Sequence, residues 1–445
     1  MDAARKWAES HRQKHQDDYF EFLRFRSIST DPAYKSDVDA CARWVQKYLA
    51  DSGLHTELLQ TPVHPVVYAE SRPHLPGKPT VLIYGHYDVQ PVDPLELWTS
   101  DPFKPTIRDG KVFARGAVDD KGQIFYAMAA MRYFRTLPIN IKFCIEGEEE
   151  AASVGLSKIL DGQKFKADYL LVVDYDSYDE QTPAINLGAR GILSLEAVLT
   201  GSKGDLHSGL YGGIAYNPNR ALVEMLSKLY DSNGRVMVDG FYDGVTEPTA
   251  EEKKAYPERM QKADYTRQVG IEAFGGEKGR SLQEANVFRP VLEINGISGG
   301  YAGPGFKTVI PAKAVAKISC RLVPNQDPGK IARQIETFLQ KHVPAGMHLH
   351  VEHHSGAPAF RSKPDSKLAE AVASASSEVM GRPCQRVLSG ASVPITAPLA
   401  KAAGAEAVGM GYGLPTDQIH APNEHFDMTR FERGLLTVIK TLERM

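Results

Sequence analysis

Short apolar runs alternate with helical stretches between residues 80 and 175, and this alternation constrains the fold more than any other feature of the chain. The runs Val81–Tyr84, Ile139–Ile145 and Tyr169–Val173 have the length and composition of buried strands. Helical periodicity lies between them, for example from Ile124 to Phe134. Strands that are connected through helices pair in parallel, with the helices packed on the faces of the sheet. The sequence therefore predicts an α/β domain with a mostly parallel sheet and helices on both faces.

The pattern changes after Gly188 to strands with one exposed face. Residues 192–199 alternate apolar and polar side chains, and a helix capped by Asn217 is expected from Pro218 to Tyr230. Two strands, a helix and a last strand follow at Val291–Ile297, Ala314–Val323, Pro328–His342 and Met347–His353. This order, strand, helix, two strands, helix, strand, is the ferredoxin-like α+β (βαββαβ) arrangement. A polar insertion at about 231–285 interrupts it, and we expect loops and short helices there.

Alternating helices and strands resume from residue 359, so the chain divides into parts. A chain of 445 residues is too long for a single hydrophobic core. We expect residues 1–187 and 359–445 to form one catalytic α/β domain. Residues 188–358, which include the insertion, are expected to form a second domain inserted into the first.

Composition and charge argue against several classes of protein. With 52 basic and 55 acidic residues the net charge is −3, and no long basic run occurs, so we expect no nucleic-acid partner. No apolar stretch approaches the roughly 18 residues of a membrane-spanning helix, and the first residues lack the apolar core of a signal peptide. The four cysteines are scattered, as free thiols are in a reducing compartment. We therefore expect a cytoplasmic protein with no membrane partner.

Histidine and carboxylate side chains follow the predicted strands at several places, where open α/β sheets have their active sites. Imidazole and carboxylate groups are ligands that suit zinc, and also manganese and cobalt. Each place alone has a plainer interpretation, such as a polar strand end, a helix cap or a solvated acidic loop. Together they predict a two-metal hydrolase site, made of Gly85–Pro91, Asp119–Gly122, Glu148–Glu150, Val173–Asp174 and Ile419–His420.

Neighbouring residues within these places favour metal chemistry. Residues two apart on a strand face the same side, so His86 and Asp88 project together, and one can ligate a metal while the other orients the site. The adjacent Asp119 and Asp120 repel each other unless a cation lies nearby. In the run Glu148–Glu150, one glutamate can bind a metal while its neighbour acts as the general base of hydrolysis.

At these residues the chain resembles the carnosinase / aminoacylase / desuccinylase family of co-catalytic zinc peptidases, and within it most closely the cytosolic dipeptidase branch. The resemblance covers essentially the whole chain. It implies two divalent metal ions per subunit, zinc or else manganese or cobalt. One ion would be bound by His86 and Asp174. The other would be bound by Glu150 and His420, with Asp119 bridging both ions.

The same resemblance implies how the reaction proceeds. Glu149 would be the general base, Asp88 would orient His86, and the Asp119–Asp120 peptide bond would be cis. A hydroxide that bridges the two metals would attack the carbonyl carbon of the substrate. The implied reaction is hydrolysis of the peptide or amide bond of a small dipeptide-like substrate with a free carboxylate.

Further matches lie in the inserted domain, which the resemblance implies is a lid and a dimerisation domain. The segment around His207 resembles one that reaches into a neighbouring subunit's active site, so the protein would be a homodimer in which His207 stabilises the oxyanion in trans. Arg321 would bind the substrate carboxylate by bidentate hydrogen bonds, with the help of His354. Thr308 and Ser392 would also contact the substrate. The plainer alternatives are a turn residue for His207, a surface ion pair for Arg321 and a histidine-rich strand end for His354.

One segment departs from the dipeptidase pattern. Dipeptidases of this branch carry Arg-Glu-Gly-Gly-Ser where this chain has Leu388–Ser392, so Ser392 is kept but Leu388 and Ser389 replace both charged residues. Dipeptide hydrolysis is therefore one of two enzymatic alternatives, and the other is deacylation of N-acyl amino acids by the same site. A third hypothesis, an inactive binding protein of this fold, predicts that a ligand or the general base is lost. All of these residues are present.

Overall fold

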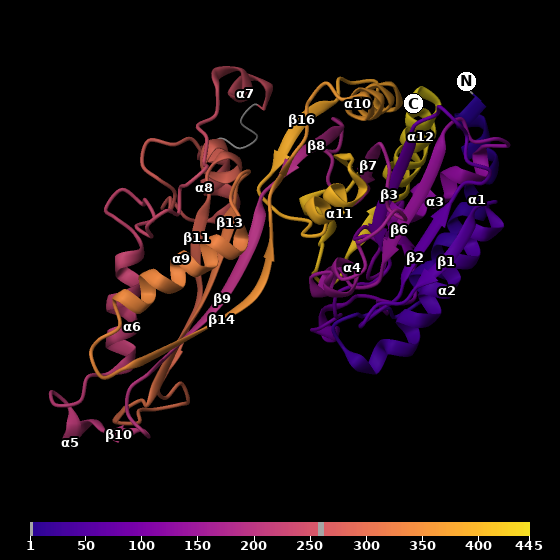
Figure 1. Ribbon diagram of the computed structural model, residues 1–445. Coiled ribbons are helices and arrows are strands. Elements are labelled where there is room, and N and C mark those ends of the chain that lie inside the picture. The colour runs from indigo at the N-terminus through magenta and orange to yellow at the C-terminus, as the bar shows by residue number, and fades with distance from the viewer. Residues whose placement is uncertain (1–2, 257–261) are drawn as a thin grey trace. The chain divides into compact units, whose positions relative to one another are not determined.

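The computed structural model describes residues 3–256 and 262–445, and the chain divides into two compact units (Figure 1). Unit 1 consists of Met1–Gly188, Arg361–Leu388 and Val393–Met445. Unit 2 consists of Ala189–Phe360 together with the short segment Ser389–Ser392. Residues 1–2 of the expected catalytic domain, and residues 257–261 of the expected insertion, lie outside the described residues.

Unit 1 is built on a mixed sheet. Across the sheet its strands are β1 (His55–Leu59), β2 (Val66–Glu70), β6 (Asn140–Glu146), β3 (Thr80–His86), β7 (Tyr169–Val172), β17 (Glu406–Met410), β8 (Ala184–Ala189) and β15 (Phe360–Arg361), and β16 (Gln385–Ser389) also pairs with β8. The central strands β6, β3, β7 and β17 are parallel, whereas β2 pairs antiparallel with β1 and β6, and β8 pairs antiparallel with β17. The expectation of a mostly parallel sheet is therefore correct at the centre and wrong at the flanks. The short connection 60–65 between β1 and β2 permits only antiparallel pairing, since a parallel pair needs a crossover of a dozen or more residues.

Helices cover the sheet of unit 1. They include α1 (Ala3–Leu23), α2 (Lys35–Asp51), α3 (Lys121–Ala130), α10 (Lys367–Met380), α11 (Thr396–Ala403) and α12 (Met428–Arg444). Every side chain of α3 is buried, because α3 packs on β3 while α1 and α12 cover its other side. In Figure 1, α11 lies on the opposite side of the sheet from α1 and α12. No helix among the described residues combines the length and hydropathy of a membrane-spanning segment.

Between the strands that end at Ile145 and begin at Tyr169, the sequence predicts a helix over about 153–161. The structure contains a much shorter helix there, α4 (Val154–Ser157). Ala152 and Ser153 have positive φ values of 73° and 52°, a left-handed conformation in which a right-handed helix cannot start. Hydrogen bonds from Lys158 to Gly155 and from Ile159 to Leu156 then tighten and end the helix. Much of this stretch therefore forms the turn that follows the predicted acidic run.

Unit 2 contains a second sheet, in the order β11 (Val291–Gly299), β13 (Lys313–Leu322), β9 (Gly191–Thr200) and β14 (His348–Ala357), with all neighbours antiparallel. Alternate residues of β9 are buried in one core with α6 (Pro218–Leu226) and α9 (Pro328–Lys341). The side chain of Asn217 accepts a hydrogen bond from the backbone N–H of Asn219 and caps α6, as expected. The elements follow one another along the chain in the order that the sequence predicts.

The described part of the 231–285 insertion contains loops and short helices. These are α7 (Ala250–Ala255), α8 (Lys262–Val269) and, at its end, a π-helical turn at Glu284–Phe288. The buried Arg289 ties the insertion to β11, since its guanidinium lies 2.9 Å from Glu247 and 3.0 Å from Glu277.

Candidate metal centre

The parallel strands of unit 1 bring the expected metal ligands to one edge of the main sheet. His86 ends β3, Glu150 lies in the turn after β6, and Asp174 follows β7. Asp119 comes just before α3, and His420 lies in the loop after β17. Because parallel strands point the same way, their carboxyl ends meet at the same edge. The expected ligands, which are far apart in the chain, therefore lie close together in space.

Asp119 lies between the two histidines of this cluster. Its Oδ1 is 3.2 Å from Nε2 of His86, and its Oδ2 is 2.8 Å from Nε2 of His420. Asp174 lies 3.9 Å from His86, and Glu150 lies 3.3 Å from His420. The possible ligand atoms form two groups, His86 with Asp119 and Asp174, and Asp119 with Glu150 and His420, and within each group they lie within 4.8 Å of one another. A single carboxylate shared by two groups has the form of a bridging ligand.

Asp88 is fully buried and holds two parts of the centre in place. Its Oδ1 lies 3.3 Å from Nδ1 of His86, the ring nitrogen that faces away from Asp119. Its carboxylate also accepts hydrogen bonds from the backbone N–H groups of Glu149 and Glu150, both at 3.2 Å. Asp88 therefore fixes the His86 ring and the turn that carries both glutamates.

Ionisation of all the carboxyl groups of the centre is unfavourable, because the groups are buried and their negative charges repel one another. Burial, together with the charge of the nearby Asp119, raises the pKa of Asp174 to about 7. Burial also raises the pKa of Glu149 and of Glu150, with their acidic neighbours adding to the effect. A hydrogen bond to Asp119 and the nearby carboxylate of Glu150 raise the pKa of His420 to about 10. A positive charge bound among these groups would relieve the repulsion.

The donor groups fit divalent metal ions. The Oε1 atom of Glu150 is buried and accepts no hydrogen bond from any residue that the structure describes. Imidazole nitrogens and carboxylate oxygens, without a thiolate in either group, are the donors of catalytic zinc, manganese or cobalt sites. The Asp119–Asp120 peptide bond is cis, as the resemblance implies, and Oδ2 of Asp120 accepts a hydrogen bond from the backbone N–H of His86 at 3.0 Å.

Glu424 supports the centre in a way that the sequence did not predict. Its carboxylate is fully buried and lies in the same loop as His420. It accepts hydrogen bonds from Nη1 of Arg115 (2.8 Å) and from the backbone N–H groups of Gly116 (2.9 Å), Val118 (2.9 Å) and Asp119 (3.2 Å). Glu424 thus connects the loop of His420 to the loop of Asp119. The only feature of the sequence that pointed to Glu424 was its position close to His420, a predicted ligand.

The remaining expected site residues lie in unit 2, where four of them form two separate groups. Nη1 of Arg321 donates to Oγ of Ser392 at 2.8 Å. His207 and Thr308 are neighbours, because β10 (Leu206–His207) pairs with β12 (Val309–Ile310) and Ser208 N–H donates to the backbone oxygen of Thr308. His354 is exposed, with Nδ1 3.7 Å from Glu352.

The two groups lie at opposite ends of the sheet of unit 2. Arg321 is opposite Ile192, near the start of β9, whereas β10 follows the end of β9 at Thr200. Figure 1 shows β10 and α5 (Ser208–Tyr211) beyond that end of the strands. At about 3.4 Å per residue, the stretch of β9 from Ile192 to Thr200 is roughly 27 Å long. Arg321 and His207 of one chain are therefore too far apart to contact the same dipeptide.

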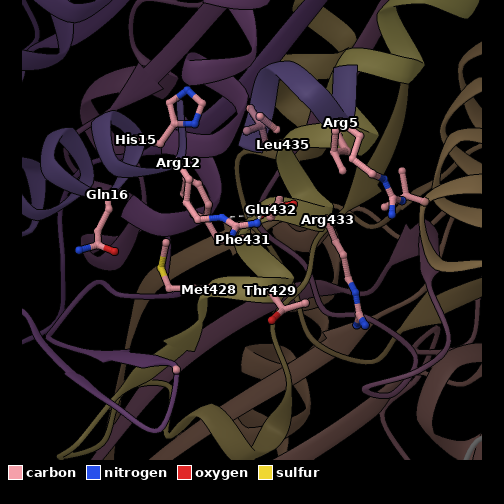
Figure 2. A pocket seen from close by; sticks show the side chains of 14 residues that line it. Arg5, Arg12, His15, Gln16, Met428, Thr429, Phe431, Glu432, Arg433 and Leu435 are labelled. Atoms are coloured by element: carbon pink, nitrogen blue, oxygen red, sulfur yellow. Dashed lines mark hydrogen bonds and ion pairs between the residues drawn. The ribbon is translucent and has the colours of Figure 1, made fainter. Parts of the chain in front are cut away.

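A different cavity of unit 1, of about 450 Å³, lies between α1 and α12 (Figure 2). Arg12 from α1 and Glu432 from α12 form an ion pair of 2.7 Å there, and the buried His15 lies beside it. Its lining residues in the described chain include none of the expected ligands or catalytic residues. This cavity is not part of the candidate metal centre.

Comparison with known proteins places the chain in a family. A family model described as peptidase family M20/M25/M40 matches residues 82–444, which is most of the chain. The parallel sheet with its carboxylate and histidine centre has the form of a metal-dependent hydrolase, and the chain belongs to this peptidase family. The resemblance stated from the sequence, and the expectation of a metallopeptidase, are confirmed.

Two curated relatives and two solved structures illustrate the similarity. Cys-Gly metallodipeptidase dug1 of Schizosaccharomyces pombe is 32% identical over 378 residues, which are 81% of this chain and 78% of that protein. Beta-Ala-His dipeptidase of Homo sapiens is 37% identical over 288 residues, which are 63% of this chain but only 57% of that protein. The structure of Sso-CP2, an M20 family metallo-carboxypeptidase from Sulfolobus solfataricus, is 32% identical with a TM-score of 0.87, covering 96% of this chain and 98% of that one. The structure of the di-peptidase Dug1p from Saccharomyces cerevisiae is 26% identical with a TM-score of 0.85, covering 99% and 97%.

Proposed function

We propose that the protein is a metal-dependent dipeptidase that hydrolyses the peptide bond of small substrates with a free carboxylate. The observation that carries this proposal is the position of Asp119 between His86 and His420, with Glu150 and Asp174 on either side. The relatives named as dipeptidases and metallodipeptidases support the same class of substrate.

The proposed ligands divide between two ions that share one carboxylate. His86 and Asp174 would hold one ion and Glu150 and His420 the other, with Asp119 between them. Two divalent ions in such a site lower the pKa of a water molecule and polarise a substrate carbonyl. Zinc is the metal we propose first, since imidazole and carboxylate donors suit it, and manganese or cobalt fits the same donors.

Glu149 is the proposed general base. Its neighbour Glu150 belongs to the ligand groups, whereas Glu149 does not, so its carboxylate stays available for proton transfer. Burial, helped by the charge of Asp174, raises its pKa. A carboxylate of raised pKa takes a proton from the attacking water and returns it to the leaving amine more readily than an ordinary glutamate does. Asp88 holds Glu149 and the His86 ring in position for this transfer.

We further propose that residues 188–358 form a ferredoxin-like lid and dimerisation domain, and that the protein is a homodimer. The roughly 27 Å stretch of β9 that separates the two groups of unit 2 supports this. Arg321, with Ser392, would bind the carboxylate of a substrate, and His354 and Thr308 would complete the contacts. His207 would act on a substrate in the partner subunit, where it would stabilise the oxyanion.

Deacylation of N-acyl amino acids is the second candidate function. It uses the same centre and differs at the amino end of the substrate, which a deacylase accepts in blocked form. The observation that favours it is Ser389, a neutral residue where the dipeptidase pattern has a glutamate. We also propose that the protein acts in the cytoplasm, since its four cysteines are free thiols and three of them are buried.

The test is hydrolysis of a matched panel by protein reconstituted with zinc or manganese. The panel contains a free dipeptide, its N-acetylated amino acid counterpart and the same dipeptide with an amidated carboxyl end. We expect cleavage of the free dipeptide and loss of turnover on amidation. Cleavage of the N-acetylated substrate alone would replace the dipeptidase assignment with a deacylase. No turnover of any substrate by the protein with two bound metals would contradict both.

A further inference from the structure

Two arginines of unit 2 lie together at the segment Ser389–Ser392. Nε of Arg190 donates to the backbone oxygen of Gly390 at 2.9 Å, and Nη1 of Arg321 donates to Oγ of Ser392 at 2.8 Å. The Ser392 hydroxyl in turn donates to the backbone oxygen of Arg190. The two guanidinium groups are therefore anchored on one short segment of chain, next to each other.

Neither guanidinium has an acidic partner within the described part of the chain. The hydrogen bonds that anchor them end on a carbonyl oxygen and a hydroxyl, and no ion pair to Arg190 or Arg321 occurs among residues 3–256 and 262–445. Burial and the charge of Arg321 lower the pKa of Arg190 to about 10, so it is still cationic near neutral pH. The carboxylate that opposes this shift, Glu293, is exposed. Two like charges held together in this way favour an anion between or beside them.

A cavity lies next to the side chain of Arg190. Its volume is about 560 Å³, and its other walls come from β11, from the 231–285 insertion and from Asn286 of the π-helical turn. The other charged residues that line this cavity are Arg289, Glu277 and Glu293. Asn286 packs tightly against Gly390, where an added Cβ would meet Oδ1 of Asn286 at 1.6 Å. The π-helical turn therefore packs against the segment that anchors the arginines, and only glycine fits at position 390.

The sequence removes the charge that would otherwise balance this pair. Where the dipeptidase pattern has a glutamate, this chain has Ser389, whose hydroxyl accepts a hydrogen bond from the backbone N–H of Ala391. A glutamate at that position would add a negative charge one residue from the carbonyl that anchors Arg190. Without it, the segment Ser389–Ser392 that anchors both guanidinium groups carries no acidic side chain, so the two arginines attract anionic groups of a substrate and repel cationic ones.

We propose that Arg190 is a second substrate-binding arginine, which together with Arg321 selects substrates with two carboxylates on the residue after the scissile bond. This inference rests on the proposed function, in which Arg321 binds the α-carboxylate. Arg190 then binds the side-chain carboxylate of a C-terminal aspartate or glutamate. The substrate class is dipeptides, or N-acyl amino acids, that end in an acidic residue.

The test compares pairs of substrates that differ only in charge, Ala-Glu with Ala-Gln and Ala-Asp with Ala-Asn. We expect the wild-type protein to have a kcat/KM roughly tenfold or more higher for the acidic member, because charge-assisted hydrogen bonds to arginine are strong. Arg190→Gln should remove that ratio mainly by raising KM for the acidic substrate. Ser389→Glu should reduce the ratio as well, because it restores a negative charge. Arg333→Gln, on the exposed face of α9, is the matched loss of one positive charge and should leave the ratio unchanged.

Equal kcat/KM values for the two members of each pair in wild type would overturn the inference while leaving the dipeptidase proposal intact. So would an equal loss for both members in Arg190→Gln, since that is the mark of a structural defect. If no dipeptide is hydrolysed, the proposed function fails and binding decides the inference separately. Calorimetry should then detect tighter binding of N-acetylglutamate than of N-acetylglutamine by wild type, and no difference in Arg190→Gln. Equal binding of both would overturn it.

Discussion

The backbone N–H of Glu149 donates to Oδ1 of Asp88 at 3.2 Å, so the backbone of the proposed general base is bound by the same carboxylate that contacts the His86 ring. This bond holds the main chain of Glu149 and leaves its side chain free to turn toward a reacting water. The position of the base and the orientation of a ligand are therefore set by one buried aspartate. A change at Asp88 affects both, whereas a change at the Glu149 side chain affects only proton transfer.

Replacing the proposed base should separate catalysis from metal binding. Glu149→Gln keeps the shape of the side chain and the backbone hydrogen bond to Asp88, but it cannot accept a proton. We expect kcat to fall roughly 10²–10⁴-fold with little change in KM, as is usual for the loss of a general base. Elemental analysis should find the same metal content as in wild type. A variant that loses metal along with activity would indicate that Glu149 is a ligand instead.

The shared carboxylate should be distinguishable from the terminal ones by metal stoichiometry. Asp119 belongs to both ligand groups and Asp174 to only one. We expect Asp119→Asn to lower the affinity for both ions, whereas Asp174→Asn should leave one ion tightly bound. Titration of the metal-free variants with zinc, followed by elemental analysis of the dialysed proteins, measures the difference. Equal losses in the two variants would contradict the bridging role.

Glu424 should act on the centre through the backbone it holds. In wild type both carboxylate oxygens of Glu424 accept hydrogen bonds from the loop of Asp119. The side chain of the Glu424→Gln variant has only one acceptor oxygen, so the loop loses part of its support. We expect metal affinity to fall roughly 10- to 100-fold, as is usual for groups that orient ligands. The absorption spectrum of the cobalt-substituted protein should change as well. Glu432→Gln, which alters a surface ion pair with Arg12, is the matched control and should change neither.

The sequence locates the residues that we propose as ligands better than the residues that support them, and the reason is geometric. His86 and Asp174 lie at the ends of apolar strands, which periodicity locates, and parallel pairing then brings them together. The role of Glu424 depends on backbone N–H groups about 305 residues away in the chain, to which no local pattern points. The residues at 389–392 belong with unit 2, although the chain around them belongs to unit 1. That placement depends on hydrogen bonds to Arg190 and Arg321, which the sequence does not reveal.

The flanks of the main sheet were missed for a related reason. Strand β1 lies at the edge of the sheet with its side chains half exposed, and β2 is a short run beside it, so neither resembles a long buried strand. The core strands are recognisable because both of their faces are buried. Edge strands carry a weaker apolar signal, and the direction in which they pair depends on the length of the connecting loop.

His15 should make the stability of unit 1 depend on pH. Burial lowers the pKa of His15 to about 4, while the imidazole of an unfolded chain titrates near 6.5. Between these values the unfolded state binds the proton more strongly, so stability falls as the pH falls from about 6.5 to about 4. A shift of this size corresponds to roughly 3 kcal/mol. With metal removed from both proteins, the melting temperature of His15→Phe should fall less between pH 7 and pH 4.5 than that of wild type. Parallel decreases would contradict this, because they would show that the pKa of His15 is the same in the folded and the unfolded chain.

Mixing two inactive variants tests whether His207 acts across the dimer. In one chain His207 and Arg321 lie at opposite ends of the sheet of unit 2, and we propose that a complete site takes its His207 from a second chain. We expect His207→Ala and Glu149→Gln each to be nearly inactive alone. In a heterodimer, the His207→Ala chain keeps its own Glu149 and receives His207 from its partner, so one of the two sites is intact. Random exchange of subunits should therefore restore about one quarter of wild-type activity. No recovery after exchange, with heterodimers verified by differently tagged chains, would show that His207 serves its own subunit or none.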